Sequence, residues 1–136
     1  MFALLSLGFG ARADHDQPIT YNQLPQTAQA LLKQYFGDKV PLIVTMDWDD
    51  YTIVYDSGEK VEFDKNGNWK DIECYNSKVP NEAVPAQIST YISQNYPGKS
   101  VIKIERHRSV YEVKLNNGME IEFNRNFQVI DMDFDD

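Results

Sequence analysis

Apolar residues recur along the chain at two spacings, and the change from one spacing to the other marks the predicted elements. Over residues 24–36 the apolar positions follow helical spacing, and Pro25 stands where a helix begins without losing a hydrogen bond. Over residues 40–75 apolar and polar positions alternate, which is typical of half-buried strands. Turn residues at 56–58 and 65–67, each set including a glycine, separate these strands. The pattern predicts one helix followed by an antiparallel meander of about four strands.

The same pattern returns sixty residues later. Residues 24–74 align with residues 84–134 without a gap, and the apolar register is kept. Identical residues occur at the pairs Pro25/Pro85, Gln34/Gln94, Lys39/Lys99, Tyr51/Tyr111, Gly58/Gly118, Glu62/Glu122, Phe63/Phe123, Asn66/Asn126 and Asp71/Asp131. Chance can produce the identities but rarely keeps the register as well, so the sequence predicts an internal duplication.

The two copies together predict an α+β fold. It consists of two tandem helix-plus-antiparallel-meander repeats, joined into one continuous antiparallel sheet with both helices on one face. The other sheet face is expected to stay open. In this interpretation residues 1–13 are the remnant of a signal peptide, 14–22 a flexible N-terminal segment, 23–78 repeat 1 and 79–136 repeat 2, and the repeats form one structural domain.

The first thirteen residues differ from the rest of the chain. Residues 2–10 form an apolar run that is too short to span a bilayer, and the Ala-Arg-Ala of residues 11–13 follows it. This pattern indicates the end of a secretory signal cleaved after Ala13, although the usual basic start is missing; the alternative is a buried N-terminal strand. No cysteine follows the cleavage point, so we expect no lipid anchor. The predicted location is periplasmic or secreted, without membrane insertion.

Composition narrows the classes of function. The chain carries 13 Lys and Arg against 21 Asp and Glu, a net charge of −8, which disfavours binding to nucleic acid or anionic membranes. Its 42% hydrophobic residues suffice for a core and argue against disorder. The single cysteine, Cys74, excludes an internal disulfide and a cysteine-rich zinc site, and we expect it to be a buried core thiol.

The turn and strand positions of the two copies carry a family pattern. In this sequence it comprises Tyr51-x-Ile53, Gly58, Val61-Glu62-Phe63-Asp64 and Gly67-Asn68-Trp69, and then Tyr111-x-Val113, Gly118 and Ile121-Glu122-Phe123-Asn124. This pattern resembles the PepSY-like, β-lactamase-inhibitor-like family of exported proteins common in gut Bacteroidetes. The resemblance covers nearly the whole chain after the predicted signal, and it implies a tandem helix-plus-sheet fold and non-catalytic binding.

The resemblance is weaker in the second copy, and it does not extend to the residues with which such inhibitors contact an enzyme. Phe127 and Val129 stand where the first copy has Gly67 and Trp69, so we expect the second turn to be shaped differently. β-Lactamase inhibitory proteins, which have a comparable tandem architecture, clasp an enzyme on the open sheet face. No contact motif of those inhibitors matches this chain, so the resemblance supplies no inhibitory residue.

Acidic residues are the first candidates for chemistry. Asp47, Asp49 and Asp50 surround a turn, and further aspartates end the chain at 131–136, a set of oxygen ligands that suits Ca²⁺. The EF-hand pattern is absent, so we expect solvated charges and no metal site. Glu62 and Glu122 recur at equivalent strand positions opposite buried residues, where we expect them on the open face.

Catalytic motifs are not found in the sequence. It has no G-x-S-x-G motif, no Ser-His-Asp arrangement and no glycine-rich phosphate loop before a helix. Cys74 lacks a convincing histidine partner, since His107 lies near a turn and His15 in the N-terminal segment. We therefore expect no enzyme and no cofactor. A hydrolase remains the third and least favoured function.

The aromatic and basic residues favour an interface. Trp48 and Trp69 are expected toward the open face or its rim, and Arg106 and Arg108 give the second copy a basic edge. Exposed Trp and Arg are common anchors of protein interfaces. The sequence thus predicts an exported, non-enzymatic module, monomeric or weakly dimeric, that binds an unidentified protein or peptide. The alternative is a Ca²⁺-binding structural protein of the cell envelope.

Overall fold

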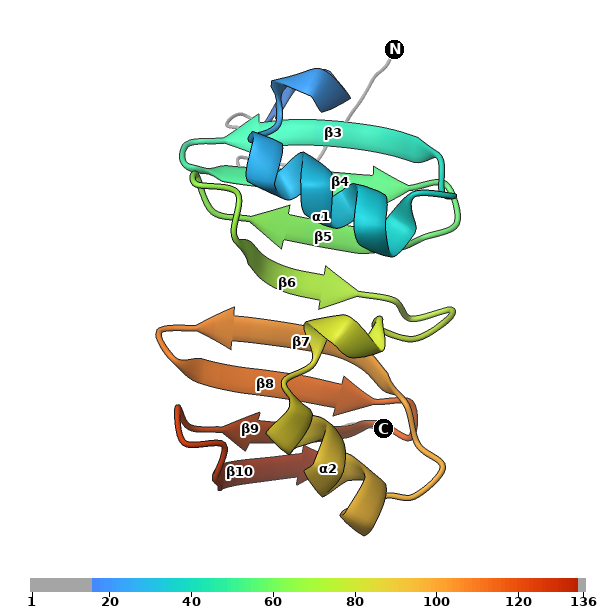
Figure 1. Cartoon of the computed structure of the whole chain (residues 1–136), viewed down its shortest axis with the longest axis vertical. Coiled ribbons are helices and arrows are strands. Elements are labelled where there is room, and N and C mark those ends of the chain that lie inside the picture. The colour runs from blue at the N-terminus through green and yellow to red at the C-terminus, as the bar shows by residue number, and fades with distance from the viewer. Residues whose placement is uncertain (1–15, 135–136) are drawn as a thin grey trace. The chain divides into compact units, whose positions relative to one another are not determined.

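The computed structural model describes residues 16–134, which form two α-helices, two 3₁₀ helices and nine strands (Figure 1). The elements are β2 (Gln17–Pro18), η2 (Tyr21–Gln23), α1 (Gln26–Phe36), β3 (Pro41–Asp47), β4 (Asp50–Tyr55), β5 (Lys60–Phe63), β6 (Trp69–Glu73), η3 (Asn81–Ala83), α2 (Ala86–Asn95), β7 (Val101–His107), β8 (Val110–Leu115), β9 (Met119–Phe123) and β10 (Val129–Phe134). The strands follow the order β10-β9-β8-β7-β6-β5-β4-β3-β2 in an antiparallel sheet, which confirms the predicted α+β class. In the described part of the chain, neither helix has the length and apolar character to cross a membrane.

The described chain divides into two compact units. Unit 1 holds residues 16–56 and 62–69, and unit 2 holds residues 57–61 and 70–134. The sequence placed a boundary between residues 78 and 79, but most of β6 groups with unit 2 because this strand pairs with β7. Element bounds nonetheless recur after sixty residues, as in β3 and β7 or β4 and β8. A duplication as the origin of these halves stays a prediction.

The core of unit 1 forms where α1 meets its strands. Pro25 precedes the helix, as the sequence predicted, and the helix buries Ala28, Leu32 and Phe36 at helical spacing. The Phe36 ring lies 5.4 Å from the ring of Tyr55 in β4, measured between centroids. Full burial of side chains of this size contributes about 1.5–3 kcal/mol each, so this contact fixes the helix on one face of the strands.

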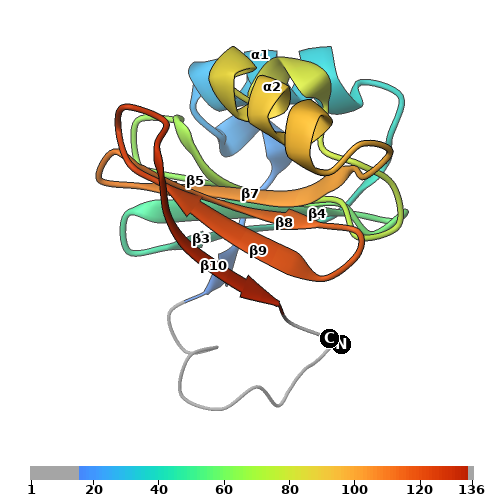
Figure 2. The ribbon, with the colours of Figure 1, turned by 90° about the horizontal axis from the view of Figure 1, so that it is seen from below.

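The core of unit 2 is built in the same manner. The helix α2 buries Ile88 and Ile92, and its Tyr91 ring contacts the Phe123 ring of β9 edge to face at 5.5 Å. Cross-strand pairing aligns a fully buried apolar row, Ile72, Ile104, Val113 and Ile121, over β6 to β9. In Figure 2 α2 lies over one face of these strands. We call the opposite face of unit 2 its open face.

The N-terminal segment corrects one prediction. Residues 14–22 were expected to be flexible, but Gln17 and Pro18 pair with Met46 and Thr45 of β3. The 3₁₀ helix η2 follows, and Oε1 of Gln23 accepts a 2.8 Å hydrogen bond from the Thr20 amide. A two-residue strand has no period that a sequence can reveal, which explains the error. The predicted signal remnant at 1–13 lies outside the described residues.

The turns before β6 and β10 correct another prediction. Gly67 and Phe127 both adopt a left-handed backbone, with φ of +87° and +63°. Asp64 accepts hydrogen bonds from the backbone amides of residues 66 and 68. In the second turn Asn124 accepts the equivalent bonds from the amides of residues 126 and 128. The two turns therefore have the same hydrogen-bond pattern, and the expectation of a differently shaped second turn is wrong. The Phe127 ring packs 5.6 Å from Tyr111, which supports its unusual backbone.

The close approach of Gly67 to α1 yields a prediction. A Cβ at Gly67 would stand 2.9 Å from Cβ of Pro25 and 3.1 Å from the amide nitrogen of Ala28. Gly98 also has a positive φ, of +82°, but a Cβ there meets nothing within 4 Å. Gly98→Ala should cost only the backbone strain of a positive φ, about 1 kcal/mol, whereas Gly67→Ala adds a steric clash to that strain. Gly67→Ala should therefore lower the melting temperature more than Gly98→Ala. Calorimetry of both variants checks this expectation, and equal losses would contradict it.

Candidate functional site

The open face of unit 2 carries a continuous row of carboxylates. Cross-strand partners are Asp71 with Glu105, Glu105 with Glu112, Glu112 with Glu122, and Glu122 with Asp131. We call these five residues the carboxylate row. They lie on the face opposite the buried apolar row because successive residues of a strand point to opposite faces. Directly opposed like charges destabilise a sheet, so stability of the fold does not explain this arrangement.

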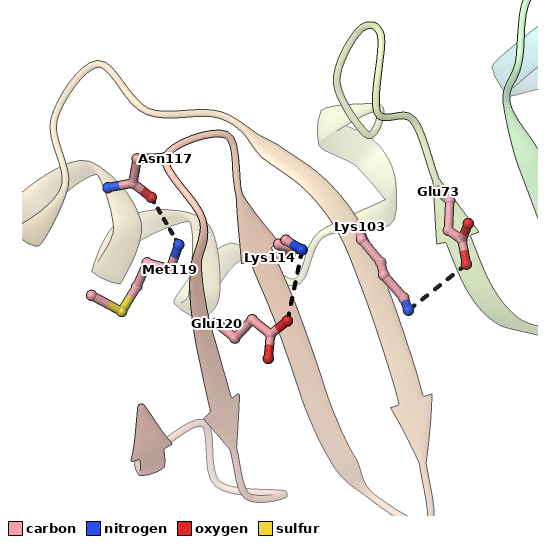
Figure 3. Close-up of polar contacts among 6 residues, drawn as sticks. All are labelled: Glu73, Lys103, Lys114, Asn117, Met119 and Glu120. Atoms are coloured by element: carbon pink, nitrogen blue, oxygen red, sulfur yellow. Dashed lines mark hydrogen bonds and ion pairs between the residues drawn. The ribbon is translucent and has the colours of Figure 1, made fainter. Parts of the chain in front are cut away.

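A second row on the same face mixes the signs of charge. It runs over β6 to β10 as Glu73, Lys103, Lys114, Glu120 and Asp133. Figure 3 shows each lysine reaching a carboxylate: Nζ of Lys103 lies 3.7 Å from Oε2 of Glu73, and Nζ of Lys114 lies 3.9 Å from Oε2 of Glu120. Two lysines thus face eight carboxylates over the two rows, and the open face is strongly acidic.

The carboxyl group of Asp71 is the most perturbed group of the row. Only 7% of this residue is accessible, and among residues 16–134 nothing donates a hydrogen bond to its Oδ1. Burial, then a hydrogen bond with the Glu73 side chain and the charges of Glu73 and Glu105, raise the pKa of Asp71 to about 8, against the opposing effect of Lys103. The neutral acid therefore prevails at neutral pH.

The middle of the carboxylate row borders a cavity of about 320 Å³. Its lining residues are Glu105, His107, Arg108, Val110, Glu112 and Glu122. Partial burial, followed by a hydrogen bond with Glu105 and the charges of the neighbouring carboxylates, raises the pKa of Glu112. A larger cavity of about 520 Å³ lies beside α1 in unit 1, but no carboxylate lines it. We therefore regard the acidic cavity as the candidate site.

The structure brings together two of the residues that the sequence selected. Arg108 and Glu122 line the acidic cavity. Arg106 lies opposite Tyr111 and shares the face of the buried Ile104, away from the carboxylate row. Glu62 and Trp48 belong to unit 1.

Trp48 and Arg108 occupy equivalent positions in the two hairpin turns. Trp48 lies between β3 and β4, is 76% exposed and has a φ of +49°, while Arg108 lies between β7 and β8 and has a φ of +53°. A large residue in this left-handed region is uncommon. The expected exposure of Trp48 is observed.

Trp69 corrects the sequence interpretation. We expected it toward the open face, but only 6% of it is accessible and it belongs to the core. The counting of alternate positions fails at this residue. In the equivalent strand β10 the register shifts between Val129 and Asp131 and places Val129 opposite the buried Phe123. We therefore no longer treat Trp69 as a binding residue.

Sequence reasoning missed the centre of the site. Asp71, Glu105 and Glu112 were not selected, although the alternation of acidic with apolar residues in their strands was visible. That signal predicts a charged strand face but does not tell which charges are neighbours. The register of four strand pairs is needed to align them in one row.

Other sequence candidates are placed apart. Cys74 is buried, as expected, and its amide donates a hydrogen bond to the carbonyl of Ile102 in β7. His107 lies five residues after Ile102, which corresponds to about 16 Å along a strand. Cys74 and His107 therefore do not form a thiol–imidazole pair, and His15 lies outside the described residues. Within residues 16–134, no three Asp, Glu, His or Cys side chains are grouped as the ligands of a metal ion.

The raised pKa of Asp71 predicts a pH-dependent stability. Between about pH 4 and pH 8 the folded chain holds a proton at Asp71 that the unfolded chain has released, so this group makes stability fall as pH rises. Asp71→Asn removes this effect. The stability of the variant relative to the wild type should therefore rise from about pH 4 to about pH 8 and level off above that, as measured by urea unfolding. Asp133→Asn, an exposed change on the same face, is the control, and an equal gain in that variant would contradict the assignment.

Comparison with known proteins gives relatives for this fold. A family model described as "Putative beta-lactamase-inhibitor-like, PepSY-like" matches residues 49–131. A solved structure described as a "putative calcium-regulated periplasmic protein", from Bacteroides thetaiotaomicron, is 43% identical; the match covers 89% of this chain and 98% of that chain, with a TM-score of 0.86. No curated protein matches the chain.

Two solved structures from Bacteroides vulgatus ATCC 8482 are also similar. One, described as a "putative periplasmic protein from DUF2874 family", is 46% identical, with 89% of this chain and 98% of that chain covered and a TM-score of 0.87. The other, described as a periplasmic protein of unknown function, is 30% identical, with 87% and 98% covered and a TM-score of 0.82. Because the family model spans more than half of the sequence, the chain belongs to the PepSY-like, beta-lactamase-inhibitor-like family.

Proposed function

We propose that the protein is an exported, non-enzymatic binding module that holds a basic segment of a protein partner on the open face of unit 2. The carboxylate row carries this proposal. Five carboxyl groups are aligned on adjacent strands, those that are charged repel one another, and a bound Lys or Arg side chain would relieve that repulsion. The preorganised strands reduce the entropy lost on binding.

Location and family support the same function. The similar structures are described as periplasmic proteins, and the sequence of residues 2–13 predicts the end of a secretory signal. An exported domain that displays an acidic sheet face meets other proteins of the envelope, whose basic segments suit its charge. The sequence contributes no catalytic motif to the proposal.

Residues outside the carboxylate row would add specificity. Arg108 lines the acidic cavity beside Glu105 and Glu112, where it can contact an acidic or carbonyl group of the partner. In unit 1 the exposed indole of Trp48 is an anchor of the kind that interfaces use. Glu122 belongs to the carboxylate row itself, whereas Arg106, on the opposite face, and Glu62, in unit 1, remain candidates for separate contacts with the partner.

The carboxylate row can be tested with an oligolysine peptide as a probe. Glu105→Gln combined with Glu112→Gln removes two central charges and should weaken binding by about tenfold, since two exposed ion pairs together contribute roughly 1.4 kcal/mol. Isothermal titration calorimetry at low salt measures the change. Glu82→Gln in η3 is the control for net charge and should change the affinity little. If the control loses at least half as much binding free energy as the double variant, the site is wrong.

A second candidate function is a response to Ca²⁺. The buried carboxyl of Asp71 favours it, because nothing in residues 16–134 donates a hydrogen bond to its Oδ1 and Ca²⁺ could displace the proton that this group holds at neutral pH; one similar protein is described as calcium-regulated. In this case millimolar Ca²⁺ should raise the melting temperature of the wild type and leave that of Asp71→Asn unchanged. An unchanged melting temperature of the wild type would exclude this candidate and leave the protein-binding function standing.

A further inference from the structure

The strand β10 is an edge strand with an apolar side that nothing covers in the described part of the chain. Among the strands of residues 16–134 it is the last in the sheet order, and of these strands it hydrogen-bonds only to β9. Ile130, Met132 and Phe134 are 52%, 46% and 56% exposed, while Asp131 and Asp133 belong to the acidic rows of the open face. An exposed edge with large apolar side chains is a template for pairing with another strand.

The chain contains its own example of a strand that covers such an edge. The strand β6 stands sixty residues before β10, and β7 pairs with it. In that pair Ile104 lies opposite Ile72, which is fully buried, and Lys103 lies opposite Glu73 and forms an ion pair with it at 3.7 Å. The counterpart of Ile72 in β10 is Met132, which stays 46% exposed. The difference is the missing neighbour strand.

We propose that β10 accepts an extended segment of another protein as an added antiparallel strand, and that this segment alternates apolar and basic residues. The apolar residue would lie opposite Met132, as Ile104 lies opposite Ile72, and a lysine would lie opposite Asp133, as Lys103 lies opposite Glu73. Backbone hydrogen bonds supply the affinity of such strand addition, and the alternating side chains supply its specificity. The inference rests on the proposed function and specifies how the partner is held.

A second copy of this chain suits the edge poorly. A symmetric antiparallel pairing of two β10 strands around Met132 places Asp131 of one copy opposite Asp133 of the other. Like charges directly opposite each other are destabilising, whereas a basic segment finds a carboxylate at both positions. Charge complementarity thus selects a basic partner over self-association.

The probe for this proposal is a synthetic peptide with the sequence of β7, Val101–His107. Titrated into the isotope-labelled protein, it should shift the backbone NMR signals of β10 and β9 in a saturable manner. A peptide with Glu105→Lys replaces a like charge opposite Asp131 by an opposite one and should bind several-fold more tightly, and a peptide with Lys103→Glu should bind more weakly. Shifts confined to β6 would show exchange with the chain's own β7 and would overturn the proposal.

Protein variants complete the test. Met132→Lys removes the apolar contact and should weaken the peptide by at least about tenfold, and Asp133→Lys, an exposed change that leaves the apolar side intact, should weaken it several-fold. Leu42→Lys is the matched control, since Leu42 of β3 is 65% exposed and lies outside β10. The proposal is wrong if the peptide fails to bind at about millimolar concentration, if Leu42→Lys weakens it as much, or if sedimentation shows a dimer that Met132→Lys dissociates.

The two proposals can fail separately. Glu105→Gln with Glu112→Gln should weaken oligolysine while leaving the strand peptide bound to β10, because these carboxylates lie in β7 and β8. If that variant loses oligolysine binding and the strand peptide does not bind to β10, the proposed function is supported and the strand addition is wrong. If the strand peptide binds to β10 but the row substitutions do not change oligolysine binding, the strand addition is supported and the carboxylate row is not the binding site.

Discussion

The pairing of β6 with β7 is the constraint on which the chemistry of unit 2 depends. One register places Ile72 opposite Ile104 in the core and Asp71 opposite Glu105 on the open face. Because side chains alternate along a strand, a slip by one residue would bury the acidic row and expose the apolar one. The fully buried apolar row therefore sets the register, and the alignment of the carboxylates follows from it.

The carboxylate row is costly to the fold. Burial and the neighbouring carboxylates raise the pKa of Asp71 to about 8, so the row carries less than its full formal charge at neutral pH. The apolar core on the other side of the same strands offsets the remaining repulsion, with residues such as Ile121 and Val113 almost fully buried. An acidic face can thus be maintained in a charged state that an isolated strand pair could not support.

A comparison of β6 with the edge strand β10 shows how a neighbouring strand changes the exposure of side chains in this sheet. Where a neighbour strand is present, as beside β6, an apolar side chain is buried and an acidic one gains a lysine at 3.7 Å. Where it is absent, as beside β10, the same kinds of side chain remain exposed. The unit therefore ends in a surface whose chemistry is complementary to a strand such as β7.

The sequence by itself determined the elements and the burial of most apolar positions. Helical spacing after Pro25 and period-two alternation over residues 40–75 follow from local geometry, so the sequence predicted α1 and the strands that follow it up to Glu73. Tertiary structure alone decided the burial of Trp69, the pairing of Gln17 with Met46 and the alignment of Asp71 with Glu112 through Glu105. These features depend on contacts and register between segments distant in sequence, and a local pattern contains no information on which residue of one strand lies beside which residue of the next.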